Sequence, residues 1–97
     1  MVISDKISEH TRVKRIDKIL QSEIDGEVIM LLPDMNEYMG MNNTGSAIWK
    51  LLKDEISVED IVRELLIEFE IDKDTCRNEV INYLKILLGK GLIEISS

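Results

Sequence analysis

The 97-residue sequence has very few of the residues that build disulfides, metal centres and catalytic pairs. Cys76 is its only cysteine and His10 its only histidine, which excludes an intrachain disulfide, a cysteine metal cluster and a histidine pair. No apolar run approaches the roughly 18 residues of a membrane span, and the N-terminus has no apolar signal region. We therefore expect a cytoplasmic protein with no metal, no cofactor and no membrane contact.

Bases are also scarce. With 19 acidic and 12 basic residues the net charge is −7, which argues against nucleic acid as a partner because affinity for it comes largely from Lys and Arg on phosphates. Five of the bases gather near the start of the chain: Lys6, Arg12, Lys14, Arg15 and Lys18. A solvated face and a basic arm that contacts an acidic partner are both compatible with this cluster.

What is present is typical of one small globular domain spanning residues 1–97. Hydrophobic residues make up 44% of the chain, an ordinary share for a folded protein and too high for a disordered one. Residues 1–11 are polar and mixed, and we expect them to form a flexible or loosely docked tail.

The first half of the chain predicts three strands joined by tight turns. Asp25-Gly26 lies between the β-capable runs Ile19–Ile24 and Glu27–Leu32, and this pair is typical of a two-residue hairpin turn with positive φ at both positions. Pro33-Asp34-Met35-Asn36 predicts a second turn and Glu37–Met41 a third strand. One outer strand of such an antiparallel meander must be an edge with unpaired backbone groups.

The second half predicts three helices. The first covers Thr44–Lys53, and the second follows Ser57-Val58-Glu59-Asp60, which resembles a capping box. The third begins at a cap, either Asp72 or Asp74, and ends at Gly89. The expected fold class is therefore α+β, a three-stranded antiparallel sheet followed by three helices.

The third helix carries a wide apolar arc, which is only slightly wider than that of the second helix. At about 100° per residue, one stripe contains Cys76, Val80, Tyr83, Leu84 and Leu87. Ile81 and Leu88 widen the stripe, which indicates either additional core or a groove beside the helix, while Ile86 lies off it. A short extended segment, Leu92–Ile95, follows the helix.

The sequence contains no pattern that catalysis would need. It has no Gly-rich phosphate loop, no Ser–His or Cys–His pair and no metal-ligand spacing. Its carboxylates lie on helix faces expected to be solvated. We therefore predict a binding module and not an enzyme, and the methionines near the edge strand suit an adaptable peptide groove as well as a core.

The order of these motifs resembles the PqqD-like family of precursor-peptide recognition elements, over about Ile19 to Ile95. The most specific part is Met41-Asn42-x-Thr44-Gly45-x-Ala47-Ile48-Trp49, where the family usually has Leu-Asn-x-Thr-Gly followed by a small residue and an aliphatic or aromatic pair. Met41 replaces the leucine and keeps its apolar volume. The resemblance implies a winged-helix-like fold without catalytic activity.

The resemblance also implies a binding mode. Family members bind the leader segment of a precursor peptide as an added strand on the third strand, with leader side chains in a groove beside the third helix. The strand residues here are Glu37, Tyr38, Met39, Gly40 and Met41. Position and apolar spacing add pocket candidates on the helix: Val80, Tyr83, Leu84, Leu87 and Leu88. Arg77 and Lys85 are candidates to pair with leader acids.

The helical part after residue 69 looks most like the stand-alone recognition protein of bacterial lasso peptide biosynthesis. The partners would then be the leader peptide, a separate leader peptidase and, downstream, a cyclase. Two alternatives stay open: a peptide chaperone for a radical-SAM enzyme of pyrroloquinoline quinone or sactipeptide-like maturation, and a winged-helix DNA-binding regulator. An exposed edge strand could also pair with a second copy and form a homodimer.

Overall fold

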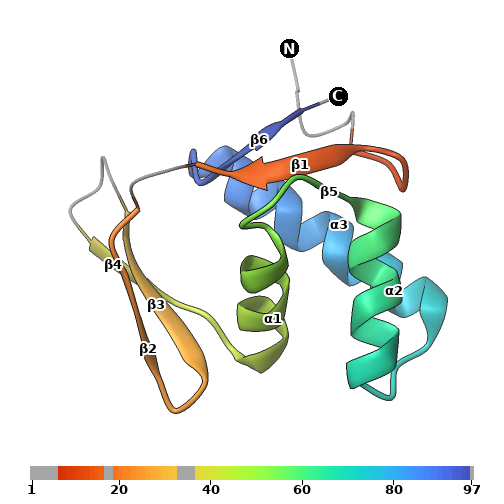
Figure 1. Ribbon diagram of the computed structural model, residues 1–97, viewed down its shortest axis with the longest axis horizontal. Coiled ribbons are helices and arrows are strands. Elements are labelled where there is room, and N and C mark those ends of the chain that lie inside the picture. Colours follow the sequence, from red (N-terminus) through yellow and green to blue (C-terminus); the bar gives the residue numbers. More distant parts are fainter. Residues whose placement is uncertain (1–6, 17–18, 33–36, 97) are drawn as a thin grey trace.

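The computed structural model describes residues 7–16, 19–32 and 37–96, and within these ranges the chain forms three helices and two three-stranded sheets (Figure 1). The strands are β1 (Arg12–Arg15), β2 (Gln21–Ile24), β3 (Glu27–Leu32), β4 (Glu37–Gly40), β5 (Ile56–Ser57) and β6 (Ile93–Ile95). The helices are α1 (Asn43–Leu51), α2 (Val58–Glu68) and α3 (Lys73–Gly89). In Figure 1, α1 stands between the β2–β3–β4 sheet and α2, and α3 passes behind α1 and α2.

The predicted meander is confirmed. β2, β3 and β4 form an antiparallel sheet in that order, with Met30 of the central strand opposite Gln21 on one side and Met39 on the other. Asp25 and Gly26 have φ values of 53° and 85°, the left-handed pair that a two-residue hairpin turn requires. The second predicted turn, residues 33–36, lies outside the described residues.

A second sheet, with the order β5-β1-β6, was not predicted from the sequence. Val13 in the centre of β1 pairs with Ile56 of β5 and with Ile95 of β6, and its side chain is fully buried. Arginine and lysine surround Val13, so a four-residue strand with one apolar residue leaves no readable alternation. β6 occupies most of the predicted extended segment after α3.

All three predicted helices are present, and each has a side-chain N-cap. Ser57 accepts a hydrogen bond from the Asp60 N–H, and Asp72 caps α3 by accepting from the Thr75 N–H, which decides between the two predicted caps. α1 begins one residue earlier than predicted because Asn42 is its cap. No helix in the described ranges is long and apolar enough to cross a membrane.

The core lies where α1, α2 and α3 meet the inner faces of the two sheets. Its largest fully buried side chains are Trp49, Met30, Ile48, Leu52, Ile61, Leu84, Leu87 and Leu92. The apolar side of α2 faces inward, with Val58, Ile61, Val62 and Leu65 buried. Every element except β2 contributes a buried apolar residue or packs a half-buried one on this cluster. The helices and both sheets therefore share one core.

Of the two forms expected for the N-terminal tail, residues 7–11 have the docked one. Ile7 belongs to the core, with only 6% of its surface exposed. The Thr11 carbonyl accepts from the Val58 N–H at 2.9 Å and the Glu9 carbonyl accepts from the Glu59 N–H at 2.9 Å. Residues 7–11 are therefore docked on the start of α2 through backbone bonds that the polar composition of the segment did not indicate. Residues 1–6 lie outside the described residues.

Leu65 offers a direct test of how α2 packs. Its side chain is 2% exposed and lies in the core between α1, α2 and α3. We expect Leu65→Ala to lower the free energy of unfolding by about 2–5 kcal/mol, because the substitution leaves a cavity that rigid neighbours fill only in part. Urea denaturation followed by circular dichroism measures the change. An unfolding midpoint equal to that of the wild type would contradict the burial of Leu65.

Candidate functional site

The segment that joins β4 to α1 is held by buried hydrogen bonds. Ser46 is buried, with 1% of its surface exposed. Its hydroxyl accepts a hydrogen bond from the Val28 N–H at 2.8 Å and donates one to the Met41 carbonyl at 3.1 Å. Asn42 caps α1 by accepting from the Gly45 N–H at 2.8 Å. These bonds fix the start of α1 on the end of the β3–β4 hairpin, so β4 is presented in one position relative to the helices.

β4 is an edge strand with its outer side open. The Met41 N–H donates to the Val28 carbonyl at 2.9 Å, which makes these two residues a hydrogen-bonded pair. Because such pairs alternate along an antiparallel ladder, Met39 also bonds to β3 whereas the N–H and C=O groups of Tyr38 and Gly40 point to the open side. No strand of the described ranges pairs with that side. The outer edge of β4 can accept an added strand.

The side chains of β4 and of Met41 differ in how far they are accessible. Met39 is half-buried against the core, and Met41 is buried with 4% of its surface exposed. Gly40 is exposed, and a Cβ placed on it would have no heavy atom within 4 Å. The side chains of Glu37 and Tyr38 lie outside the described part of the structure. Among the described side chains of the predicted strand site, Met39 is therefore accessible in part, and the backbone at Gly40 is accessible.

Three of the predicted pocket residues on α3 are core residues. Val80, Leu84 and Leu87 have no exposed surface in this structure. A side chain in this position supports the helix and cannot contact a ligand unless the core opens. The prediction that these three residues contact the leader is therefore corrected. Tyr83, which is half-buried, remains a candidate.

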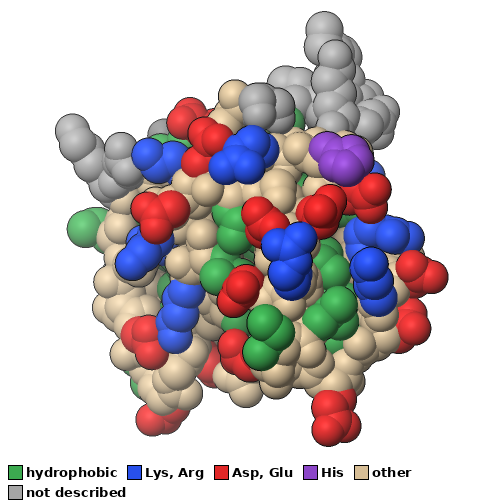
Figure 2. Space-filling view, turned by 45° about the vertical axis from the view of Figure 1, so that its right-hand side comes forward, with side chains coloured by type: hydrophobic (Ala, Val, Ile, Leu, Met, Phe, Trp, Pro, Cys, Tyr) green, Lys and Arg blue, Asp and Glu red, His purple; other side chains and the backbone are tan. Residues whose placement is uncertain are grey.

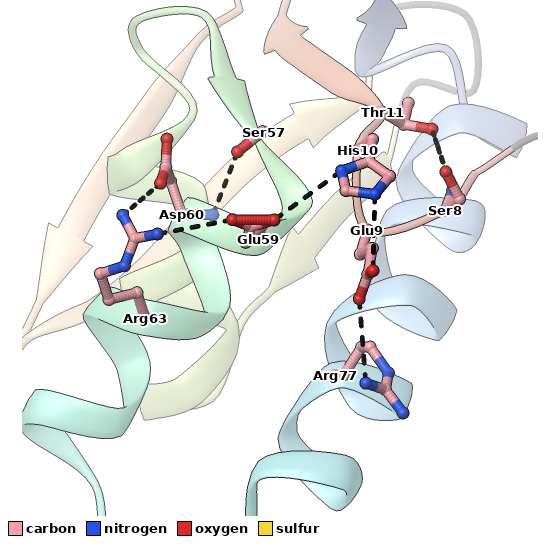
Figure 3. A network of polar contacts seen from close by, with 9 residues as sticks. All are labelled: Ser8, Glu9, His10, Thr11, Ser57, Glu59, Asp60, Arg63 and Arg77. Carbon is pink, nitrogen blue, oxygen red and sulfur yellow. Dashed lines mark hydrogen bonds and ion pairs between the residues drawn. The ribbon is translucent and has the colours of Figure 1, made fainter.

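Arg77, Lys85 and Leu88 lie on a different side of α3 from Tyr83. At about 100° per residue, Arg77 and Leu88 are about 120° or more from Tyr83 around the helix axis, and Lys85 is still further away. Arg77 faces the docked N-terminal segment, where it pairs with Glu9 at 3.9 Å (Figure 3). On its own helix it also pairs with Asp74 at 3.1 Å. The predicted grouping of these three residues with Tyr83 in one groove therefore needs correction.

Ile86 is the residue that the sequence reasoning left out. It lies about 60° around α3 from Tyr83 and is 50% exposed, one of the most exposed large apolar side chains in the structure. Its position off the buried stripe made it look like a surface residue in the sequence. The signal in the sequence that could have identified Ile86 was an apolar residue outside the buried stripe and close to Tyr83 around the helix. Exposed apolar residues mark binding surfaces when they adjoin other apolar groups.

Tyr83 connects α3 to the start of α1. Its hydroxyl oxygen is inaccessible and has no hydrogen-bond partner among the described residues. A Cβ on Gly45 would lie 2.7 Å from that oxygen, so only glycine at this position of the Asn-x-Thr-Gly motif leaves room for the ring. The motif residues Asn42 and Gly45 thus position α1 and α3 relative to each other immediately after β4.

The burial of Tyr83 predicts a loss of stability at high pH. Desolvation raises the pKa of Tyr83 to about 12, whereas the pKa of tyrosine in an unfolded chain is about 10. Between these values the folded state holds the proton and the unfolded state has lost it, so the free energy of unfolding falls as pH rises from about 10 to about 12. Urea titrations across this range should show a steeper fall for the wild type than for Tyr83→Phe. Parallel curves would contradict the assignment.

The described residues contain no group of three His, Cys, Asp or Glu side chains placed to hold a metal ion. Cys76 is buried, and burial followed by the charge of Glu79 raises the pKa of its thiol, which disfavours the nucleophilic thiolate. His10 is a surface residue near the carboxylates of Glu9 and Glu59 (Figure 3).

The fold and the site together define a small winged-helix-like binding domain with an open strand edge. The sequence profile of the family described as Coenzyme PQQ synthesis protein D (PqqD) matches residues 27–93. The chain belongs to the PqqD family, as its motifs predicted, and its α+β fold class is confirmed. No sequence among the curated proteins matches the chain.

Three solved structures are similar to the chain. One, titled TbiB1 in complex with the TbiA(beta) leader peptide, has 32% identity and a TM-score of 0.75, covering 84% of this chain and 94% of the other. A lasso peptide synthetase B1 complexed with the leader peptide has 21% identity and a TM-score of 0.73, covering 90% and 99%. The PqqD part of Methylobacterium extorquens PqqCD, described as a functional stand-alone recognition element for ribosomally synthesized and post-translationally modified peptides, has 15% identity and a TM-score of 0.76, covering 94% and 97%.

Proposed function

We propose that this protein is a non-catalytic recognition element that binds the leader segment of a ribosomally made precursor peptide by strand addition to β4. The observation that carries the proposal is the open edge of β4, where the backbone groups of Tyr38 and Gly40 point away from β3. Backbone pairing would supply affinity, and Met39, Tyr83 and Ile86 would contact alternate leader side chains.

The similarity to TbiB1 supports this ligand class. That structure holds a leader peptide, and its 32% identity extends over most of both chains. On this basis we propose that the protein acts in the cytoplasm in lasso peptide biosynthesis, where it delivers the precursor to a separate leader peptidase and then to a cyclase. The binding residues act by holding the leader extended, so that its following segment is presented to the next enzyme.

A second candidate keeps the same binding mode but changes the pathway. The description of the matching family, coenzyme PQQ synthesis, favours a chaperone that presents a precursor peptide to a radical-SAM maturation enzyme. A DNA-binding role has no such support. The net charge is −7, and Arg77 on α3 is paired with Glu9 and Asp74.

The test is a fluorescence-polarisation titration with labelled leader peptides encoded beside this gene, and with the TbiA(beta) leader as a heterologous probe. We expect saturable binding at micromolar affinity or tighter for at least one lasso-type leader. Binding only to a leader from a radical-SAM pathway would select the second candidate. If a folded, monomeric sample bound none of these peptides, the proposed function would be wrong.

A further inference from the structure

A groove with both polar and apolar lining lies away from β4, between α1, α2 and the start of α3. It consists of two hollows of about 390 and 280 Å³ that share Leu65 and Phe69. The accessible apolar lining consists of the half-buried side chains of Ala47, Leu51, Phe69 and Ile71, and the buried core residues Ile48, Leu65 and Val80 lie beneath them. None of the lining residues belongs to β4, so a leader strand added there would leave this groove free.

Four carboxylates border the groove without a cation to balance them. Glu64 and Glu68 line the larger hollow, and Glu70 and Glu79 line the smaller one. Within the described ranges, none of these four side chains makes an ion pair or a hydrogen bond. Lys50, the one base in the lining, is paired with Glu23 at 3.2 Å. The charge around this groove is strongly negative.

The surface next to this groove has a different arrangement. On the exposed outer face of α2, Arg63 pairs with Glu59 at 3.6 Å and with Asp60 (Figure 3). Figure 2 shows acidic and basic side chains mixed over the side of the molecule that includes α2. The charges of Arg63, Glu59 and Asp60 compensate each other within the protein. The carboxylates of the groove between α1 and α2 are not compensated in this way and would attract a partner of opposite charge.

Two of the groove carboxylates are also placed unfavourably for α2 itself. Glu64 and Glu68 lie in the last turns of α2, which has no basic residue in its last turn. Negative charge near a helix C-terminus opposes the helix dipole. The position of these acids therefore does not stabilise the helix that carries them, and an external cationic partner would reverse this unfavourable contribution.

We propose that this groove docks a basic, apolar-faced segment of a second protein. Resting on the proposed function, that protein would be the enzyme that receives the leader-bound precursor, held on the α1–α2 side while the leader occupies β4. Apolar side chains of the segment would enter the hollows beside Leu51 and Phe69. Its Lys or Arg side chains would meet Glu64, Glu68, Glu70 and Glu79 at the rim.

The probe for this proposal is a synthetic amphipathic helix of leucine and lysine, with a leucine and glutamate twin of the same pattern as its counterpart. Titration into the ¹⁵N-labelled protein, followed by amide chemical shifts, locates the contact. We expect shifts concentrated at Ala47, Leu51, Phe69 and their neighbours for the lysine peptide, and none for the glutamate peptide. No binding of the lysine peptide, or shifts scattered over the surface, would overturn the proposal.

Matched substitutions distinguish binding of the lysine peptide in the groove from its general attraction to an acidic protein. Glu68→Lys should weaken the lysine peptide by about tenfold, whereas Glu94→Lys, the same charge change on β6, should alter affinity by about twofold or less. Ala47→Gln, which fills the larger hollow and keeps a good helix former, should also weaken it. Equal losses for Glu68→Lys and Glu94→Lys would overturn the proposal.

The same variants keep this proposal distinct from leader recognition. Glu68→Lys should bind the labelled leader peptide as well as the wild type does, because Glu68 is on α2 and takes no part in the β4 edge. Loss of peptide docking with intact leader binding supports the groove. If the wild type bound no leader peptide, the proposed function would be wrong. The amide chemical shifts with the lysine peptide would still decide whether the groove docks a basic segment.

Discussion

Replacing Gly40 by proline is expected to lower the affinity for a bound leader peptide by at least about tenfold. Proline has no N–H to donate, and its ring would fill the space beside the strand where the leader backbone must lie. The register with β3 makes the Gly40 N–H one of the groups on the open side of β4, and the space around the Gly40 Cα is empty. Because proline is tolerated on edge strands, the variant should fold.

The fluorescence-polarisation titration measures this change, with circular dichroism and a thermal melt to establish that the variant is folded. Glu23→Pro is the matched control. β2 is the other edge of the same sheet, and the Leu31 N–H bond to the Leu20 carbonyl sets a register in which the Glu23 N–H also points outward. We expect Glu23→Pro to change affinity by about twofold or less. The reverse outcome would place the leader on β2.

The elements that could be predicted from the sequence are those specified by local chemistry. Asp25-Gly26 specifies a turn because few other pairs adopt two positive φ values, and Ser57 and Asp72 specify helix starts because their oxygens accept from orphan N–H groups. β1 and β5 could not be predicted. They form because segments far apart in the sequence meet in space, with Val13 between Ile56 and Ile95, and no local pattern records such a long-range pairing.

The strand part of the candidate site could also be predicted, but the helix part could not. An edge strand follows from the order of three hairpin-linked strands, so β4 was accessible to sequence reasoning. Helical spacing shows which residues share a face of α3 but not which neighbour covers that face. Val80, Leu84 and Leu87 proved to face the core, and Arg77 the docked N-terminal segment. Ile86 was overlooked because an isolated apolar residue on a surface is ordinary.

Trp49 is the side chain whose removal should destabilise the fold most. It is fully buried on α1, its indole N–H donates to the Gln21 side-chain oxygen at 2.7 Å, and the Arg15 guanidinium lies 5.2 Å from the ring centroid. The ring thereby connects α1 to β1 of one sheet and β2 of the other. We expect Trp49→Ala to lower the free energy of unfolding by about 3–5 kcal/mol, because a large cavity and an unpaired amide remain.

A loss of this size is a large share of the roughly 5–15 kcal/mol that stabilises a domain of this length, so the variant should melt more than about 10 °C below the wild type. Two further variants separate the contributions. Gln21→Leu removes only the hydrogen-bond acceptor and should lower stability by about 1 kcal/mol, and Trp49→Phe, which keeps an aromatic ring, should fall between the two. If Trp49→Ala melted within a few degrees of the wild type, the contact between α1 and the two sheets would not depend on this ring.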